Sequence, residues 1–366
     1  MILNIGDVVR ERSSSPFASA WRVEGYLASG RHFRHYTVRN LMPDMDGHRA
    51  VLKVIKYDPR LTHDADYVRS LRARLRRECE TLAHFSPRLP EPLDYFEIDN
   101  AQDQFEGFGA EQLRAQEPVL IQTLLHGASL AQQMEDRGAP PAPADTLLLT
   151  LAKVCGFLDE LHAGGRGWLF WALSPEHIIV DPHQEHEPSF VGCSNFRMLS
   201  HGVVVDDPAA GVLNHPPEPG YAAPEALCRG RSDHRVDVYA MGCLLFHLFT
   251  GTDPRDLAED ILARGQYGAH GSWDGDFEAS DASPQPMSHG QAQAFCEELR
   301  SSMERFCRRN LKGLGISRAR VRRMLLKAVR PDPDDRFQSP LELRDSLLAT
   351  LSRSRPVAWP DPAIDS

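Results

Sequence analysis

The first part of the chain alternates apolar and polar residues with a period of two, which is typical of half-buried β-strands. Trp21-Arg22-Val23 and Tyr36-Thr37-Val38 are two such runs, separated by a turn around Ser29-Gly30. A third run, Ala50 to Ile55, follows a turn that is rich in proline and glycine. Because glycine and proline favour turns at such points, we predict three successive strands here.

Apolar spacings of three and four begin after these strands and predict helices. The first helix is expected over Tyr67 to Phe85, and a second over Thr146 to His162. Between them, Leu93 to Ile98 and Val119 to Leu125 are typical of strands. The pattern predicts an α+β chain with a small β-rich part that includes one helix, followed by a larger, mainly helical part.

Composition fits a globular protein. The 366 residues, 42% hydrophobic and 25% charged, suffice for two lobes with a buried core. The net charge of −10 argues against a chain that coats nucleic acid. Seven cysteines form no Cys-x-x-Cys pair, so we expect neither a zinc site nor a disulfide framework. Without an N-terminal signal or a bilayer-length apolar run, we expect a cytoplasmic protein with no membrane contact.

The stretch Trp168 to Asp181, WLFWALSPEHIIVD, carries the most specific motif. Its frame L-x-P-E-x-I-x-V-D resembles the catalytic loop of the Ser/Thr protein kinase superfamily, His-Arg-Asp-Leu-x-Pro-x-Asn before a strand. Where those kinases have His-Arg-Asp, this chain has Phe170-Trp171-Ala172, and an alanine cannot accept a proton. Ser174 replaces an assisting lysine, and His177 replaces the metal-binding asparagine.

The resemblance extends to an ion pair. The run Ala50-Val51-Leu52-Lys53 matches the strand whose lysine faces phosphates, and Glu78 matches the helix glutamate that pairs with that lysine. By themselves, Lys53 would be an exposed strand lysine and Glu78 a solvated helix charge. The resemblance implies that they pair and can hold nucleotide phosphates.

Other parts of a nucleotide site are less well kept. The family's G-x-G-x-x-G pattern falls on Ala28, Gly30 and Phe33, so only Gly30 remains, and alone it would predict an ordinary hairpin turn. The hinge, where adenine would bond to the backbone, falls on Thr123 to Leu125. The resemblance implies that Gly30 and this hinge would contact ATP.

The metal-binding Asp-Phe-Gly segment of the family falls within Phe190 to Leu199. In one register Asn195, Phe196 and Arg197 take its three positions, and a register shifted by one places Ser194 first. Neither supplies the carboxylate that holds Mg²⁺ in kinases. Arg197 could attract phosphate in the cleft, or it could pair with the helix glutamate and block the site; both remain open.

Landmarks that hold the kinase fold together are present. Glu225, in GYAAPE, corresponds to a buried acid, and Arg336 should reach it, because a buried carboxylate without its arginine would be costly. Asp237 should accept hydrogen bonds from the backbone of the catalytic-like loop. The resemblance implies a bilobal protein-kinase-like fold. We predict a flexible arm over 1–16, a small lobe over 17–125, a large lobe over 126–350 and a tail over 351–366.

The chemistry positions are altered together, while the fold-holding positions are kept. An amide is a poorer Mg²⁺ ligand than a carboxylate, an imidazole suits softer metals, and a positioned base is worth about 10²–10⁴-fold in rate. We therefore predict a bacterial-type pseudokinase, a scaffold or allosteric regulator of a partner protein in signalling. Lys53 and Glu78 leave ATP binding with little or no Mg²⁺ open. The alternative is an atypical Ser/Thr kinase or another ATP-dependent transfer, such as AMP transfer.

A basic segment departs from the family. From Arg300 to Arg330 the chain has eleven Lys or Arg and one Glu, and an extra helix is expected over 292–312. A solvated helix face is the plain interpretation, and a docking surface for an acidic partner is the functional one. Because aromatic residues for base stacking are sparse, we favour a protein partner over nucleic acid. A polyanion-binding module is the second alternative.

Overall fold

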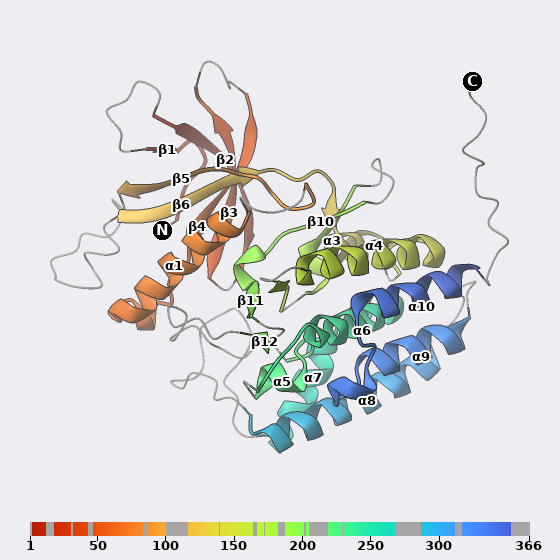
Figure 1. Cartoon of the computed structure of the whole chain (residues 1–366). Helices are drawn as coiled ribbons and strands as arrows, with labels where there is room; N and C mark the ends of the chain where they lie inside the picture. Colours follow the sequence, from red (N-terminus) through yellow and green to blue (C-terminus); the bar gives the residue numbers. More distant parts are fainter. Residues whose placement is uncertain are drawn as a thin grey trace, which may run out of the picture.

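The computed structural model describes residues 2–11, 18–30, 32–42, 47–82, 87–99, 116–138, 140–163, 167–171, 173–181, 187–200, 203–204, 219–228, 230–265, 267, 287–311 and 317–352. They form a small lobe of strands with one long helix and a large lobe of helices (Figure 1). The α+β, two-lobed fold predicted from the sequence is confirmed.

The small lobe is built on a six-stranded antiparallel sheet with the order β1-β2-β3-β4-β6-β5. Residues directly opposite each other on neighbouring strands have side chains on the same face of the sheet. His35 is opposite Lys53, and Gln122 is opposite Val51, so all four side chains lie on one face. Helix α1 (Ala65–Leu82) packs against this sheet (Figure 1). The strands are β1 (Val8–Arg10), β2 (Ala20–Ser29), β3 (Phe33–Asn40), β4 (Arg49–Ile55), β5 (Pro92–Asp99) and β6 (Gln116–Thr123).

The two faces of this sheet bury different apolar sets, because successive side chains of a strand point to opposite sides. One face forms its own small core, which includes Trp21, Val38 and Ile121. The other face joins the main core, which includes Leu71 and Leu75 of α1 and continues into the helical lobe. Lys53 projects from this second face, toward α1.

The flexible arm expected over 1–16 needs correction for residues 2–11. Val8–Arg10 is strand β1, which pairs with β2, and Val9 is buried in the small core. The backbone N–H of Gly6 also bonds to the carbonyl of Val23 at 2.9 Å. A strand of three residues is too short to produce a recognisable alternation, so no sequence pattern predicts it. Residues 12–16 lie outside the described part.

The segments that follow the hinge form two small three-stranded sheets. Their orders are β10-β9-β7 and β12-β11-β8. Because Phe190 pairs with Ile178 and Arg197 pairs with Leu169, the catalytic-like loop lies beside the segment expected to bind metal. The strands are β7 (Ala128–Ser129), β8 (Trp168–Leu169), β9 (Ile178–Val180), β10 (Pro188–Phe190), β11 (Arg197–Ser200) and β12 (Val203–Val204).

Helix α6 is the centre of the large lobe. It is apolar on all sides and nearly every residue is buried, as expected of a helix surrounded by others. Helices α4 and α10 pack together, and α8 and α9 lie below them (Figure 1). The helices are α3 (Leu130–Arg137), α4 (Ala144–His162), α5 (Pro224–Leu227), α6 (Arg235–Thr250), α7 (Pro254–Leu262), α8 (His289–Asn310), α9 (Arg318–Ala328) and α10 (Pro340–Ser352).

The expected helices are present, with shifted ends. Helix α1 begins two residues before Tyr67, and α4 two residues before Thr146. Helix α8, the extra helix, begins at His289 because Ser288 and Gln291 form a capping box there. Helix α10 runs to Ser352, slightly beyond the predicted end of the large lobe. No helix within the described ranges is long and apolar enough to cross a membrane.

Candidate functional site

Lys53 and Glu78 form a buried ion pair between β4 and α1. The ammonium of Lys53 donates to Oε1 of Glu78 at 2.8 Å and to Oε2 at 2.6 Å. Both side chains are only 2% exposed. An ion pair this deeply buried is stable only with close, complete hydrogen bonding, which this geometry provides. The structure therefore brings together the two residues that the sequence paired, with α1 held against the sheet.

The third face of that ammonium is covered by an aromatic ring. The Nζ of Lys53 lies 4.4 Å from the ring centroid of Phe33, a distance typical of a cation–π contact. Phe33 begins β3, is 4% exposed and packs into the main core. Because an ammonium has three N–H groups and two are bound by Glu78, the ring takes the place of a third partner.

Two further polar atoms on this sheet face lack a hydrogen-bond partner. They are Nδ1 of His35 and Oε1 of Gln122, both buried. Burial, together with the charge of Lys53, lowers the pKa of His35 to about 3, so its ring is neutral at pH 7. Each unpaired buried polar atom costs about 1–3 kcal/mol. A small molecule or water that hydrogen-bonds here would be stabilised accordingly.

The remaining positions expected to contact ATP lie at or just beyond the ends of strands β2 and β6. The backbone N–H of Gly30 donates to the carbonyl of Phe33 at 2.9 Å and closes the turn between β2 and β3. Thr123 ends β6, and its backbone N–H donates to the carbonyl of Glu91 at 2.9 Å. Leu125 follows and is half-buried. The hinge backbone N–H of Thr123 is therefore bound within the small lobe.

Asp237, near the start of α6, holds the catalytic-like loop by its backbone. Its carboxylate accepts from the N–H of Phe170 at 2.8 Å and of Trp171 at 2.9 Å, and from Nε2 of His162 at 2.8 Å. Trp171 has φ of 71°, the one positive value outside glycine among the described residues. Such a conformation costs about 1–3 kcal/mol in a bulky residue, so the bonds from Asp237 stabilise a strained loop.

Ser174 and His177 bind one another across a short 3₁₀ turn. The Oγ of Ser174 lies 2.8 Å from Nδ1 of His177, and the backbone N–H of Ser174 donates to that same nitrogen at 3.2 Å. Because Nδ1 accepts, the ring proton is on Nε2. Burial lowers the pKa of His177 to about 4, helped by the charges of Arg255 and Lys53 and opposed by Glu176, so the ring is neutral at pH 7.

Gly192 is the residue that faces the His177 ring. The N–H of Val191 donates to the carbonyl of His177 at 3.0 Å, which aligns the two segments. A Cβ on Gly192 would lie 2.3 Å from Cδ2 and 2.8 Å from Nε2 of His177. Asn195 follows in the turn Cys193–Asn195, and its side chain lies outside the described part. The register that places Asn195 at the metal position therefore stays a prediction.

The guanidinium group of Arg197 lies over the ring of Trp171. Its guanidinium carbon lies 5.9 Å from the Trp171 ring centroid, and its Nη1 donates to the carbonyl of Phe196 at 3.4 Å. Both carboxylate oxygens of Glu78 already accept from Lys53. Ala172, the expected position of the lost base, is outside the described residues.

A second ion group lies beside the loop, and the sequence analysis missed it. Arg255, at the start of α7, donates to Glu176 at 2.5 Å and to Asp253 at 2.9 Å. Burial alone would raise the pKa of Glu176. The charge of Arg255 and hydrogen bonds from Ser174 and Arg255 outweigh burial and lower this pKa to about 2. Glu176 and Arg255 are 79 positions apart, so no local pattern could reveal the pair.

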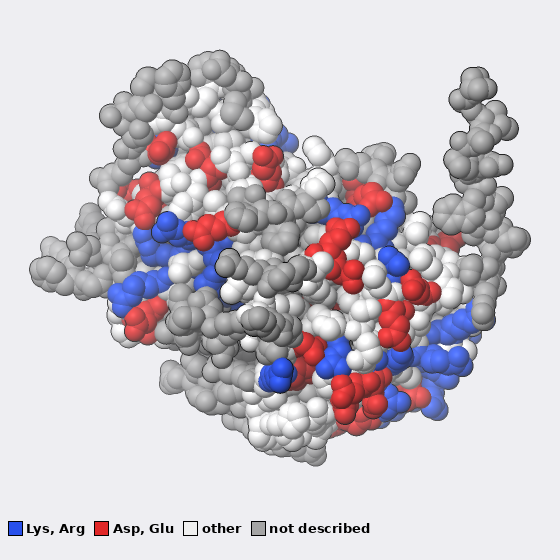
Figure 2. Space-filling view, viewed as in Figure 1, with Lys and Arg blue, Asp and Glu red and all other residues white. Residues whose placement is uncertain are grey.

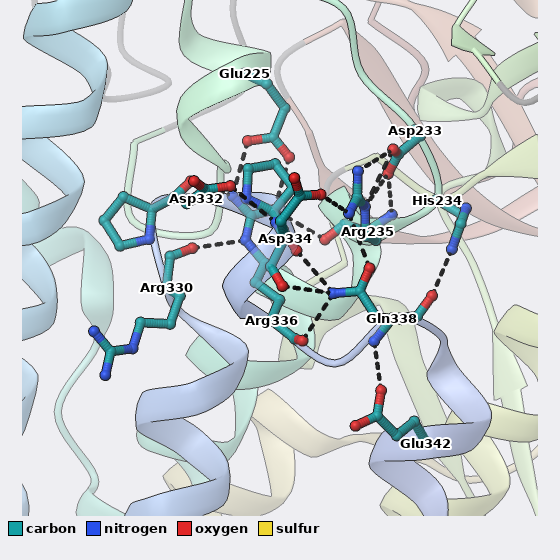
Figure 3. A network of polar contacts seen from close by, with 12 residues as sticks. Glu225, Asp233, His234, Arg235, Arg330, Asp332, Asp334, Arg336, Gln338 and Glu342 are labelled. Atoms are coloured by element: carbon teal, nitrogen blue, oxygen red, sulfur yellow. Dashed lines mark hydrogen bonds and ion pairs between the residues drawn. The ribbon is translucent and has the colours of Figure 1, made fainter.

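Glu225 and Arg336 form the other buried pair (Figure 3). Arg336 donates to both carboxylate oxygens of Glu225, at 2.7 and 2.9 Å. It also donates to the carbonyls of Arg330, Pro331 and Arg235, at 2.6, 2.8 and 3.1 Å. The arginine side chain is fully buried, and its bonds join α5 to the loop before α10. This contact fixes the base of the helical lobe.

Comparison with known structures identifies the architecture. The structure superimposes on the kinase domain of Mycobacterium tuberculosis PknI with a TM-score of 0.50, covering 90% of this chain and 96% of that one, at 21% sequence identity. The fold is that of a protein kinase domain. No protein-family model matches the sequence.

Curated proteins similar to this kinase-like domain are serine/threonine-protein kinases. Pkn3 of Myxococcus xanthus is 28% identical over 241 residues, which is 65% of this chain and 39% of pkn3. PknL of Mycobacterium tuberculosis is 27% identical over 137 residues, 37% of this chain and 32% of PknL. The chain thus spans about a third of the length of the relatives it matches.

Two facing residues beside the catalytic-like loop, His177 and Gly192, do not offer the oxygen ligands that a kinase uses for Mg²⁺. In kinases two side-chain oxygens, from an asparagine of the catalytic loop and the aspartate of the next segment, hold the metal. Here Nδ1 of His177 accepts from Ser174, Nε2 carries the proton, and the facing residue is Gly192. Neither residue presents an oxygen from its side chain, so this pair does not fit the ion, and the Asn195 side chain lies outside the described part.

Proposed function

We propose that this protein kinase-like domain is non-catalytic and works as a scaffold or allosteric regulator of a partner protein. The observation that carries the proposal is the contact between His177 and Gly192. Phosphoryl transfer depends mainly on positioning and on neutralising phosphate charge, and metal ions supply much of that neutralisation. A neutral imidazole packed against a glycine supplies none.

The covered lysine supports the same proposal. A phosphate oxygen would have to approach Lys53 Nζ to about 2.8 Å to form a charge-assisted hydrogen bond. The three directions of that ammonium are taken by the two oxygens of Glu78 and by the Phe33 ring. Nucleotide phosphates would have to displace a buried phenylalanine from the core, which costs burial of its apolar surface.

The contacts that preserve shape are complete by contrast. Asp237 holds the loop backbone, and Arg336 meets Glu225 with five hydrogen bonds to that carboxylate and to backbone carbonyls. A fold that keeps these hydrogen bonds while its chemistry positions change is what a binding role requires. The shape of the domain, rather than phosphotransfer, is then the property that a partner uses.

An atypical ATP-dependent transferase, transferring phosphate or AMP, is the second candidate. It is favoured by the closed Lys53–Glu78 pair, since this pair is one of the contacts that an active kinase requires. Unpaired Nδ1 of His35 and Oε1 of Gln122 also leave room for polar ligand groups on the same face. The relatives are named as kinases, which is consistent with this candidate.

Intact-mass measurement separates the two. The purified chain and a generic acceptor protein are incubated with ATP and either Mg²⁺ or Mn²⁺, with the Lys53→Ala variant treated in parallel. The proposal predicts unchanged masses throughout. A phosphate-sized or AMP-sized addition that depends on Lys53 would establish the transferase instead.

A further inference from the structure

The end of α8, the outer face of α9 and the residue Arg330 beyond it carry arginines that form no salt bridge with another described residue. We call Arg309, Arg318, Arg322, Arg323 and Arg330 the α9 arginine face. Each is exposed or half-buried, and none forms a salt bridge within the described part of the chain. Blue residues gather over α9 in the space-filling view (Figure 2). The Arg330 guanidinium points away from the Glu225 network (Figure 3).

Three other basic residues nearby form salt bridges. Arg300 pairs with Glu297 at 2.5 Å, and Arg308 with Glu304 at 2.7 Å, each within α8. Lys327 pairs with Glu342 of α10 at 2.7 Å. The arginines without a salt bridge in the described part also include Arg305, whose guanidinium donates to Ser302 at 2.9 Å, and Arg320, so most of them lie on or beside α9. The charges of Glu297 and Arg330 interact, as do those of Glu304 and Arg322, but no carboxylate within the described residues forms a salt bridge with this face.

The arrangement opposes the stability of α9 itself. The helix contains no acidic residue, and its first turn includes Arg318 and Arg320, where the positive end of the helix dipole disfavours cations. Arg318 and Arg322 are four positions apart, so their like charges repel across one turn. Ser317, the N-cap, makes no side-chain hydrogen bond to the helix. Local helix stability therefore does not explain these arginines.

We propose that the α9 arginine face docks an acidic segment of a partner protein. Carboxylates of the partner would form the direct salt bridges that these arginines lack, and planar guanidinium groups suit carboxylates in paired hydrogen bonds. The inference rests on the proposed function, because it names the chemistry of the partner that a non-catalytic domain would bind.

The partner chemistry follows from what surrounds the face. No aromatic residue is exposed among the described positions of 300–330, so stacking with nucleic-acid bases is not provided. The remaining surface of a net-acidic chain would repel a long polyanion. Helix α9 has 11 residues. At about 1.5 Å per residue it is about 16 Å long, which an extended peptide of about five residues spans.

A binding measurement on the full chain tests the inference. The probe is a fluorescent glutamate-rich peptide of about twelve residues, long enough to cross α9 with room to spare, and anisotropy is read without ATP at low and physiological salt. The test variant carries Arg318→Glu, Arg322→Glu and Arg323→Glu. The control variant carries Arg10→Glu, Arg22→Glu and Arg137→Glu, which changes the net charge equally at three separate, exposed places.

The inference predicts that the test variant loses about tenfold or more in peptide affinity, while the control stays within about twofold of the natural chain. Because glutamate in the first turn suits the helix dipole, the test variant should unfold at the same or a higher temperature. A triple Arg→Gln variant should also lose affinity, without added negative charge. Absence of peptide binding, or equal loss in both Glu variants, would overturn the inference.

A single-stranded oligonucleotide of equal charge serves as a second probe. The inference predicts weaker binding of the oligonucleotide than of the peptide, and tighter binding would overturn the choice of a protein partner. Since no nucleotide is present, these outcomes are independent of phosphotransfer. A positive mass shift with ATP would remove the proposed function and leave this binding result unchanged, and the reverse also holds.

Discussion

The imidazole ring of His177 occupies the space that a side chain on Gly192 would need. A Cβ built there would lie 2.3 Å from Cδ2 of His177, closer than atoms in proteins approach. Gly192 also has φ of 86°, which disfavours any other residue. The two positions are therefore coupled: the histidine requires the glycine, and a carboxylate at 192 would require a smaller residue at 177.

We expect Gly192→Ala to destabilise the domain by about 2–4 kcal/mol, through overlap with His177 and a left-handed backbone. In a His177→Ala background the cost should fall by about 1–2 kcal/mol, because only the backbone strain remains. Urea denaturation of the four proteins measures the coupling. Gly156→Ala in α4, with nothing within 4 Å of the added Cβ, is the control and should be neutral or stabilising. Equal costs in both backgrounds would refute the coupling.

Opening the face above Lys53 should restore phosphate binding. Phe33→Gly removes the ring that lies 4.4 Å from Nζ, so ATP should raise the unfolding temperature of this variant and not of the natural chain. At about 100 times Kd the stabilisation would reach about 2.7 kcal/mol. Phe33→Leu, which keeps an apolar side chain, is the matched control and should stay unresponsive. An equal response of the natural chain would show that Phe33 does not close the site.

How much the sequence could predict depended on the length of each pattern. Long periodic runs gave α1 and α4, and motif order placed Lys53 and Glu78 together across two elements. The three-residue β1 could not be recognised, because one buried residue, Val9, makes no period. The start of α8 was missed by three positions because a capping box, rather than apolar spacing, sets it.

Side-chain relationships were harder to predict than elements. In the family's glycine-rich pattern, Phe33 is only a position where a glycine is missing. Nothing in the sequence indicated that the Phe33 ring would lie over Lys53. The alignment of Gly192 with His177 follows from the pairing of β9 with β10, and strand register is not visible in a single sequence. The Glu176–Arg255 pair likewise depends on how α7 packs beside the loop.

Breaking the buried pair at the base of the large lobe should be costly. We expect Arg336→Met to reduce the free energy of unfolding by about 3–5 kcal/mol, because Glu225 would remain as an uncompensated buried charge. Adding Glu225→Leu should recover part of that loss, since the unpaired charge is removed. Arg344→Met, at the exposed pair with Asp345, should change stability by less than about 1 kcal/mol. Comparable losses for the two single variants would contradict this account.

Stability should fall with acid through His177. The unfolded chain protonates this residue near its ordinary pKa of 6.5, and the folded chain only near 4. Between these values the unfolded state binds more protons, so lowering the pH from 7 to 5 costs at most about 2 kcal/mol. Glu176, Arg255 and Lys53 are the charged groups around the ring. His177→Asn should remove the contribution of His177 to the loss of stability between pH 7 and 5. If the variant and the natural chain show the same pH dependence in unfolding curves, the ring is not buried and neutral.

The most direct measurement of the central claim is the intact mass of the chain and of an acceptor protein after prolonged incubation with ATP. Mg²⁺ and Mn²⁺ are tested separately, and an active serine/threonine kinase in the same mixture confirms that the acceptor can be modified. We predict no phosphate-sized or AMP-sized addition on either protein, with natural and Lys53→Ala chains alike. An addition that appears with the natural chain and disappears with Lys53→Ala would contradict the account and make this domain an enzyme.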